Sequence, residues 1–454
     1  MTAAELARTV GGAVTGDAGA LITGAEVDSR RVRPGDLFVA LPGERCDGHQ
    51  FVEAALAVGA AALVRCGTEQ APPPGRALIR VGDPLRAYWQ LARLERARRG
   101  WTVAAVTGSV GKTTVKDFLA HLVGRQRPTG ASTGNRNSTL GLPAELLSQP
   151  DEVEVFIAEA GTSRFGELDR LGEILRPIAV LLYTRIAPVH TEFFGGLDGI
   201  ARAKGELLPY LDPAGTLVVN AADPRQAAYA EATGARVLRY GDGGDARIEG
   251  LDDCGLLGSS FDLVLPGGRS RVELRVAGRH QAENLLAAAT AAAALGLSAE
   301  QIADAARDLQ AAPHRGRVYR LDGGVILVDD SYNASPVAVA RMLELLAAAA
   351  GRRIAVLGEM FELGELSDDA HRAAGAQAAT CCDLLLAVGG AAARRLADAA
   401  RAAGLGGVEL ADDADEAARV LGSRLRPGDV VLVKGSRGVG LDRTVAALLG
   451  EEVA

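Results

Sequence analysis

The chain has 454 residues and carries 57 acidic against 49 basic side chains, a formal net charge of −8. This length predicts about three domains, each large enough to bury its own core. The acidic balance argues against nucleic acid or an anionic membrane as a partner, because both are bound through dense lysine and arginine. The five cysteines form no CxxC pair, which suggests neither a zinc site nor a disulfide framework and fits a reducing, cytoplasmic compartment.

Neither a signal peptide nor a membrane span is expected. The segment MTAAELARTVGG lacks a basic stretch followed by an apolar one. The longest apolar runs, residues 54–64 and 285–297, are alanine-rich and shorter than the roughly 18 residues that a span requires. We expect both runs to contribute buried helices.

Residues 1–98 are predicted to form a small α/β domain. Within it, residues 51–64 predict a helix followed by a strand, and the segment 72–75, PPPG, is a loop. A helix expected over 84–99 would lead into the second domain.

The stretch 106–114, VTGSVGKTT, carries the most specific signal in the chain. It lies between an apolar run, 102–106, and a pattern with apolar residues along one helix face. Its glycines let the backbone turn its N–H groups toward a phosphate, and the helix dipole adds partial positive charge. Lys112 would reach the outer phosphates, and the Thr113 hydroxyl would ligate Mg²⁺. We therefore predict a nucleotide-binding P-loop; the alternative is an ordinary glycine-rich turn, since Val106 stands where the motif has glycine. The residues expected at the nucleotide are Gly108, Ser109, Gly111, Lys112, Thr113 and Thr114.

Short apolar runs alternate with helical patterns to the end of the chain. In the central domain, residues 99–312, strands are expected at 102–106, 153–158, 178–184 and 216–219, which predicts a mainly parallel sheet. The glycine-rich stretch 240–278 is expected to be an antiparallel edge. Residues 313–454 predict a C-terminal, Rossmann-like doubly wound domain. The fold class is therefore α/β, in three domains.

Polar residues that follow the apolar runs are the candidate site residues, because ligands of open α/β sheets bind beyond the carboxyl ends of the strands. Glu159 follows one such run and, near the P-loop, is expected to hold Mg²⁺; a surface glutamate is the alternative. His190 and Lys204 come after the next strand. Taken alone, they are typical of a structural histidine and an ordinary helix lysine.

His280 and Asn284 are four positions apart and would share one helix face, where helix capping is the alternative to a ligand contact. Arg315 lies at the expected junction of the second and third domains. It would clamp a γ-phosphate when the domains close, or line a hinge.

Two more strand ends carry polar groups. Asp330 and Asn333 follow the strand expected at 325–328, where ribose or metal contact competes with helix capping. Lys434 and Arg437 follow the last strand. These cations suit a carboxylate or phosphate, and a charged turn is the alternative.

Several stretches together are more specific than any one motif. They are VDSR, GDLFVALPGERCDGHQFV, TGSVGKTT, GNRNSTLGLP, EAGTSRFGEL, ARAKGELL, GRHQAENLLAA, HRGR, DDSYNASP, LGEMFELGE and VKGSRGVG. In these stretches the chain resembles the Mur ligases, ATP-dependent amide-forming enzymes of peptidoglycan precursor synthesis, over almost its whole length. DDSYNASP with LGEMFELGE is typical of the members that add D-alanyl-D-alanine. The Asp-Asn-Pro motif of the third-residue-adding members is absent.

The resemblance implies an ADP-forming ligase that joins D-alanyl-D-alanine to UDP-N-acetylmuramoyl-tripeptide through an acyl phosphate. It also implies ATP and Mg²⁺ as cofactors, no nucleic-acid partner, and a cytoplasmic monomer. Its rivals are another ligase of this fold, such as a third-residue-adding enzyme or a folylpolyglutamate synthetase, and a non-catalytic nucleotide-binding switch.

The resemblance also assigns roles to residues. The first domain would hold the UDP end of the substrate, the second ATP and Mg²⁺, and the third would close over ATP and bind the dipeptide. Lys204 falls where relatives carry a carbamylated lysine. The expected substrate contacts are Ser29, Arg30, Asp47, His49, Asn135, Asn137, Ser138, Lys434 and Arg437. The expected additional ATP contacts are His280 and Asn284 near the adenine, with Arg315, Asp330 and Asn333. The expected metal ligands are Thr113, Glu159, His190 and Lys204, and the expected catalytic residues are Lys112, His190, Lys204 and Arg315.

Overall fold

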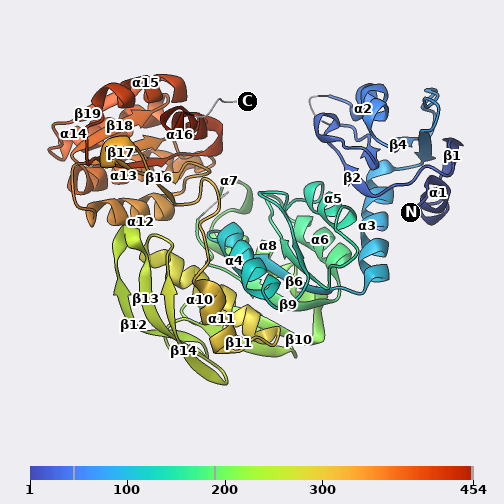
Figure 1. Ribbon diagram of the computed structural model, residues 1–454, viewed down its shortest axis with the longest axis horizontal. Coiled ribbons are helices and arrows are strands. Elements are labelled where there is room, and N and C mark those ends of the chain that lie inside the picture. Colours follow the sequence, from blue (N-terminus) through green and yellow to red (C-terminus); the bar gives the residue numbers. More distant parts are fainter. Residues whose placement is uncertain (44–45, 189–190, 451–454) are drawn as a thin grey trace.

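The computed structural model describes residues 1–43, 46–188 and 191–450, and over these ranges the chain forms three successive α/β units. Figure 1 shows the first unit (blue) and the third unit (orange to red) on opposite sides of the central unit. Apolar side chains cover both faces of the main sheet in each unit. The predicted α/β class, with parallel sheets in the central and C-terminal parts, is confirmed.

The first unit is built on a five-stranded sheet of order β1-β5-β4-β3-β2. β1 pairs antiparallel with β5, and the other neighbours pair in parallel. The strands are β1 (Ala13–Gly16), β2 (Gly24–Glu26), β3 (Asp36–Val39), β4 (Ala61–Arg65) and β5 (Ala77–Val81), and the helices are α1 (Ala3–Thr9), α2 (Val52–Val58) and α3 (Pro84–Arg99). The central strands are almost wholly apolar because helices pack on both faces.

Helix α3 joins the first unit to the central one. It begins at Pro84 because the Asp83 carboxylate accepts hydrogen bonds from two first-turn N–H groups, and it ends at Gly100, whose φ is 64°. Near its end, the Arg96 guanidinium donates to the backbone oxygens of Trp101 and Pro177, at 3.3 and 2.8 Å. These contacts tie α3 to the sheet of the central unit.

We expect Glu95→Gln to lower the free energy of unfolding by about 1–2 kcal/mol at neutral pH. Hydrogen bonds from Arg98 and then Arg99 hold the pKa of Glu95 at about 2, against an ordinary value of 4.5. A lowered folded-state pKa stabilises the fold above pH 4.5, and this contribution disappears as the pH falls toward about 2. Urea unfolding of both proteins at neutral and acidic pH measures this, and a difference that does not shrink on acidification would contradict it.

The central unit has a six-stranded, wholly parallel sheet of order β11-β10-β9-β6-β8-β7. The strands are β6 (Thr102–Thr107), β7 (Thr129–Ala131), β8 (Val155–Glu159), β9 (Ile178–Tyr183), β10 (Leu211–Asn220) and β11 (Arg236–Tyr240). The helices are α4 (Lys112–Gly124), α5 (Gly141–Leu147), α6 (Glu167–Leu175), α7 (Thr191–Phe194), α8 (Leu197–Gly205), α9 (Pro224–Glu231), α10 (Arg279–Ala294) and α11 (Ala299–Ala306). Helices α4 and α10 pack on one face, and α5, α6 and α8 on the other, while α11 packs beside α4 and α10.

The antiparallel segment expected over 240–278 is not an edge of this sheet. It forms a separate three-stranded sheet of β12 (Arg247–Asp253), β13 (Ser259–Leu265) and β14 (Gly268–Leu274). Every second residue of β13 is buried, so the sheet has one apolar face. That face packs on α10 and α11, which explains why the sheet stands apart from the parallel one.

The third unit has a six-stranded sheet of order β15-β16-β20-β17-β18-β19, in which only β15 is antiparallel within the described residues. The strands are β15 (Arg317–Arg320), β16 (Ile326–Asp330), β17 (Arg353–Gly358), β18 (Leu384–Val388), β19 (Val408–Ala411) and β20 (Val430–Lys434), and the helices are α12 (Pro336–Ala347), α13 (Ser367–Cys381), α14 (Ala391–Ala402), α15 (Ala414–Arg424) and α16 (Leu441–Leu449). Helices α12 to α14 cover one face, and α15 and α16 the other. The sequence predicts strands at 325–328, 354–357, 384–388 and 430–433 in this unit, which correspond to β16, β17, β18 and β20. The two edge strands, β15 and β19, were not predicted.

No helix in the described parts of the chain combines the length and the apolar composition needed to cross a membrane.

Candidate active site

The loop between β6 and α4 has the conformation that a phosphate-binding turn needs. Gly108 and Gly111 have φ of 139° and 85°, and a Cβ on Gly108 would lie 2.1 Å from Thr184 Oγ1. The N–H groups of Ser109 and Val110 donate to the Arg185 carbonyl, at 2.9 and 3.4 Å, which fixes the loop. The first turn of α4 presents N–H groups that have no intrahelical acceptor. The local geometry is therefore that of an anion site at a helix N-terminus.

Lys112 begins α4 and is half-buried in the same place. Its Nζ donates to the Ser109 carbonyl at 3.2 Å. Burial lowers its pKa, and the nearby Arg315 charge acts in the same direction, while Glu159 opposes both. Two cations, Lys112 and Arg315, face one carboxylate, Glu159, in this site. A bound phosphate would neutralise the excess positive charge and favour the charged form of Lys112.

Glu159 ends β8 and is almost completely buried. Its Oε1 accepts a hydrogen bond from Asn137 Nδ2 at 2.6 Å, and its N–H donates to Ser132 Oγ at 2.9 Å. Its Oε2 is buried and has no hydrogen-bond partner among the described residues. A buried carboxylate oxygen without a hydrogen-bond partner is suited to bind a cation.

Of the other expected metal ligands, Thr113 lies in the same cleft as Glu159. The Thr113 hydroxyl accepts from Arg315 Nη2 at 3.1 Å. His190 lies outside the described residues. Within the described ranges no group of three or more His, Cys, Asp or Glu side chains could hold a metal unaided. This donor set suits Mg²⁺, which commonly takes one or two protein carboxylates and completes its shell with phosphate and water oxygens.

Lys204 lies on α8 and is 2% exposed. Burial holds its pKa well below the ordinary value, and the Lys112 charge lowers it further. Much more of this amine is therefore neutral than in an exposed lysine.

The third unit supplies cations and an aromatic ring to the P-loop. Arg315 stacks on Tyr332, with its guanidinium carbon 3.8 Å from the ring centroid, and Arg437 lies 5.1 Å from the same centroid. Lys434 Nζ pairs with Asp330 Oδ2 at 2.5 Å and donates to the Asn333 carbonyl at 2.8 Å. Much of the Lys434 charge is therefore neutralised, whereas Arg315 and Arg437 face the cleft.

A cleft of about 450 Å³ joins these groups between the central and third units. Of the expected residues it is lined by Ser109, Gly111, Lys112, Thr113, Thr114, Asn135, Asn137, Glu159, His280, Asn284, Arg315, Asp330, Asn333, Lys434 and Arg437. The structure thus brings together residues that are up to 328 positions apart, from Ser109 to Arg437.

Other expected residues do not line this cleft. They are Gly108 behind the loop, Ser138, Lys204 and the first-unit residues Ser29, Arg30, Asp47 and His49. Arg30 makes a bidentate pair with Asp28. His49 Nδ1 lies 2.6 Å from Asp47 Oδ1, and its Nε2 accepts from the Arg65 N–H at 3.1 Å, so both ring nitrogens are engaged within the first unit.

Sequence reasoning gave no role to several cleft residues, among them Gln281, Tyr332, Phe361, Glu362 and Ser436. Tyr332 and Ser436 each lie within two positions of an expected site residue, and their neighbours could have indicated them. Phe361 lies in LGEMFELGE, and 45% of it is exposed.

Lysine is scarce in this protein. The chain has four, at positions 112, 116, 204 and 434. Lys112 and Lys434 line the cleft. Lys116 donates to the carbonyl of Ser132 at 2.7 Å, and the hydroxyl of Ser132 accepts from the Glu159 N–H. Lys116 is 2% exposed, like Lys204 and Lys434.

Comparison with known proteins identifies the family. The family models described as "Mur ligase family, catalytic domain", "Mur ligase middle domain" and "Mur ligase, glutamate ligase domain" match residues 21–94, 106–292 and 314–437. The UDP-N-acetylmuramoyl-tripeptide–D-alanyl-D-alanine ligase of Mycobacterium tuberculosis is 35% identical over 508 residues, covering 100% of this chain and 98% of that one. A crystal structure of MurF from Acinetobacter baumannii superposes with a TM-score of 0.88, 30% identity and 99% coverage of both chains. MurF from Thermotoga maritima in complex with ADP gives a TM-score of 0.79 at 29% identity, covering 95% and 98%. The chain belongs to the Mur ligase family.

Proposed function

We propose that this protein is an ATP-dependent, ADP-forming ligase that joins D-alanyl-D-alanine to UDP-N-acetylmuramoyl-tripeptide. The main support for this proposal is the cleft at the N-terminus of α4. Lys112 and Glu159 of the central unit and Arg315 of the third unit meet there. The choice of substrates rests on the relatives of that name, which match at 33–35% identity over most of the chain.

The reaction proceeds in two steps. The terminal carboxylate of the tripeptide attacks the γ-phosphorus of ATP, a C–O–P linkage forms, and the bond to ADP breaks. The amine of D-alanyl-D-alanine then attacks the acyl carbon, loses a proton, and expels inorganic phosphate. Phosphorylation is needed because a carboxylate has no good leaving group. Lys112 and Arg315 stabilise the charge on the transferring phosphoryl group.

Mg²⁺ would be held by Glu159 and Thr113, with His190 and Lys204 as the further ligands we propose. When bound, it neutralises phosphate charge and orients the phosphates. Asn137, which donates to Glu159, keeps the carboxylate oriented toward the cleft.

Each unit has its own ligand in this proposal. The first unit binds the UDP end of the substrate near Ser29 and Arg30, with Asp47 and His49 shaping the adjacent turn. The central unit binds ATP, with His280 and Asn284 on the adenine side. The third unit completes the phosphate site and binds the dipeptide, with Lys434 and Arg437 as its expected contacts. We propose a cytoplasmic monomer.

We expect Lys204 to be carbamylated. Burial lowers the pKa of its amine, which favours the neutral form that attacks carbon dioxide with release of a proton, and the resulting carbamate would bind Mg²⁺ where an ammonium would be repelled. With four lysines and one N-terminus, a ¹³C spectrum recorded in labelled bicarbonate should be simple, and Lys204→Ala should remove one carbamate resonance. Identical spectra of the two proteins would refute the modification.

Phosphate release tests the function as a whole. The protein is assayed with UDP-N-acetylmuramoyl-tripeptide, ATP and D-alanyl-D-alanine, omitting each in turn, and the expected result is sustained release only in the complete mixture. Replacing the dipeptide by single amino acids tests for a third-residue-adding or folylpolyglutamate-type ligase. ATP binding without turnover under all these conditions would favour a nucleotide-binding switch.

A further inference from the structure

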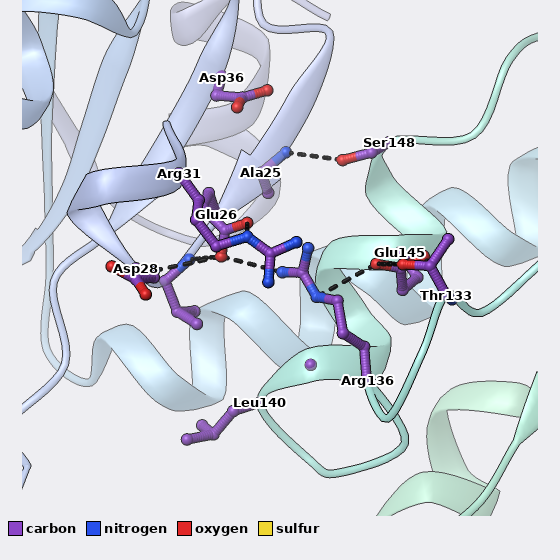
Figure 2. A network of polar contacts seen from close by, with 12 residues as sticks. Ala25, Glu26, Asp28, Arg31, Asp36, Thr133, Arg136, Leu140, Glu145 and Ser148 are labelled. Carbon is purple, nitrogen blue, oxygen red and sulfur yellow. Dashed lines mark hydrogen bonds and ion pairs between the residues drawn. The ribbon is translucent and has the colours of Figure 1, made fainter. Parts of the chain in front are cut away.

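A buried cluster of charged side chains joins the first unit to the central unit. Figure 2 shows Arg136, from the loop before α5, between Glu26 at the end of β2 and Glu145 on α5. Arg136 Nη2 lies 2.9 Å from Glu26 Oε1, and its Nε lies 3.1 Å from Glu145 Oε1. Glu26 and Glu145 are 5% and 7% exposed. We propose, building on the function above, that Arg136 is a positioning residue that holds the UDP-binding unit and the loop 133–138 in register with the ATP cleft.

On the first unit, the cluster organises the turn that precedes Ser29 and Arg30. Glu26 Oε1 accepts hydrogen bonds from the N–H groups of Val27 and Asp28, at 2.8 and 3.2 Å, and also from Arg136. The carboxylate that shapes the turn is therefore the one that Arg136 holds. A looser contact, 3.8 Å, joins its Oε2 to Arg31 Nε.

On the central unit, the cluster fixes both ends of the loop. Glu145 Oε2 accepts from the Thr133 N–H, and its Oε1 accepts from the Thr133 hydroxyl, both at 3.0 Å. Gly141 lies against Arg136 so closely that a Cβ there would be 2.9 Å from Arg136 Cα. The loop is thus clamped from its first residue to the start of α5.

The clamped loop reaches the active site at its next residue. Asn137 directly follows Arg136, donates to Glu159 Oε1 at 2.6 Å, and accepts from the Gly161 N–H at 2.9 Å. Asn135 directly precedes Arg136 and lines the same cleft as Glu159. A change in the orientation of the first unit is therefore transmitted through Arg136 to the side chains on either side of it.

Neutral hydrogen bonds also join the two units near this cluster, and Arg99 at the C-terminal end of α3 pairs with Asp151 at 3.0 Å. Helix α3 donates from Tyr88 Oη to the Leu140 carbonyl at 3.0 Å and from Trp89 Nε1 to the Thr139 carbonyl at 2.7 Å. The Ala25 N–H donates to Ser148 Oγ at 3.2 Å (Figure 2). These bonds hold the units together without a charged partner. Arg136 pairs with a carboxylate of each unit and is directly followed by Asn137, which donates to Glu159.

The test compares Arg136→Lys and Arg136→Met with wild type and with Arg127→Met. The control removes an arginine from an exposed pair with Glu154 in the same unit, 3.3 Å apart. We expect both Arg136 variants to raise KM for the UDP-substrate about tenfold or more, with KM for ATP within about twofold of wild type. Lysine cannot span both carboxylates as a guanidinium does, so it should restore thermal stability more than it restores KM.

Glu26→Gln is the second variant, because it keeps the side-chain shape and removes one buried charge. We expect it to raise the same KM. Hydrogen exchange supplies a readout that needs no turnover: amides of residues 133–140 should exchange faster in Arg136→Met, while those of α4 should not. If the wild-type protein ligates nothing, the function proposed above fails, and hydrogen exchange still decides the role of Arg136.

Two results would overturn the positioning role. One is an equal rise in KM for both substrates, which would indicate general loss of structure. The other is unchanged exchange over 133–140 in Arg136→Met.

Discussion

Lys112→Ala should lose ATP-dependent ligation while keeping its fold. Lys112 is half-buried at the N-terminus of α4 and donates to a loop carbonyl rather than to a core group. Its removal deletes a charge-assisted contact that is strongest when the phosphoryl group is in transfer. We expect a loss on the order of 3 kcal/mol or more in transition-state stabilisation, which is more than about 100-fold in kcat. Phosphate release in the complete mixture measures it.

Thermal unfolding supplies the control for this variant. Because burial lowers the pKa of Lys112, removing its amine should leave the unfolding temperature unchanged or slightly higher. A folded Lys112→Ala protein that turns over at nearly the wild-type rate would remove the basis of the P-loop assignment.

Glu159→Gln should be the second most damaging change. The amide keeps the size of the side chain and can still accept from Asn137. It cannot offer an anionic oxygen in place of Oε2, which is buried and has no partner in the described part of the chain. We expect kcat to fall on the order of 100-fold and the Mg²⁺ concentration for half-maximal activity to rise. A Mg²⁺ titration of phosphate release measures both quantities.

The matched control is Glu154→Gln, which removes the charge of an exposed glutamate at the other end of the same segment. It should leave the Mg²⁺ titration unchanged. If Glu159→Gln also titrates like wild type, Glu159 does not hold the metal.

The central features of the fold followed from local patterns. The P-loop combines an apolar strand, two glycines of positive φ and a helix start, all within residues 102–124. Each of these parts has a local sequence pattern by which it can be recognised. The inner parallel strands followed for the same reason, because strands buried on both faces are continuous apolar runs. The parallel edge strands β7 and β11 of the central sheet were not predicted. The edge strands β15 and β19 are half-exposed and carry no such signal.

The features that escaped prediction depend on contacts between distant segments. The sheet of β12, β13 and β14 alternates as an edge hairpin would, and only its packing on α10 and α11 separates it from the main sheet. The ring of Tyr332 contacts two arginines, Arg315 and Arg437, that are distant from it in the sequence. Arg136 is one arginine among many in the sequence, and its partners Glu26 and Glu145 are identified only when two units meet.

The placement of the lysines has a consequence for chemical labelling. Since three of the four are buried and the fourth is half-buried in the cleft, the outer surface presents arginine rather than lysine as its cation. Amine-reactive reagents should therefore find few targets besides the N-terminus and Lys112. A protein of this kind can be attached to a support or a dye through its N-terminus under mild conditions. Protection of Lys112 by ATP would then report nucleotide occupancy directly.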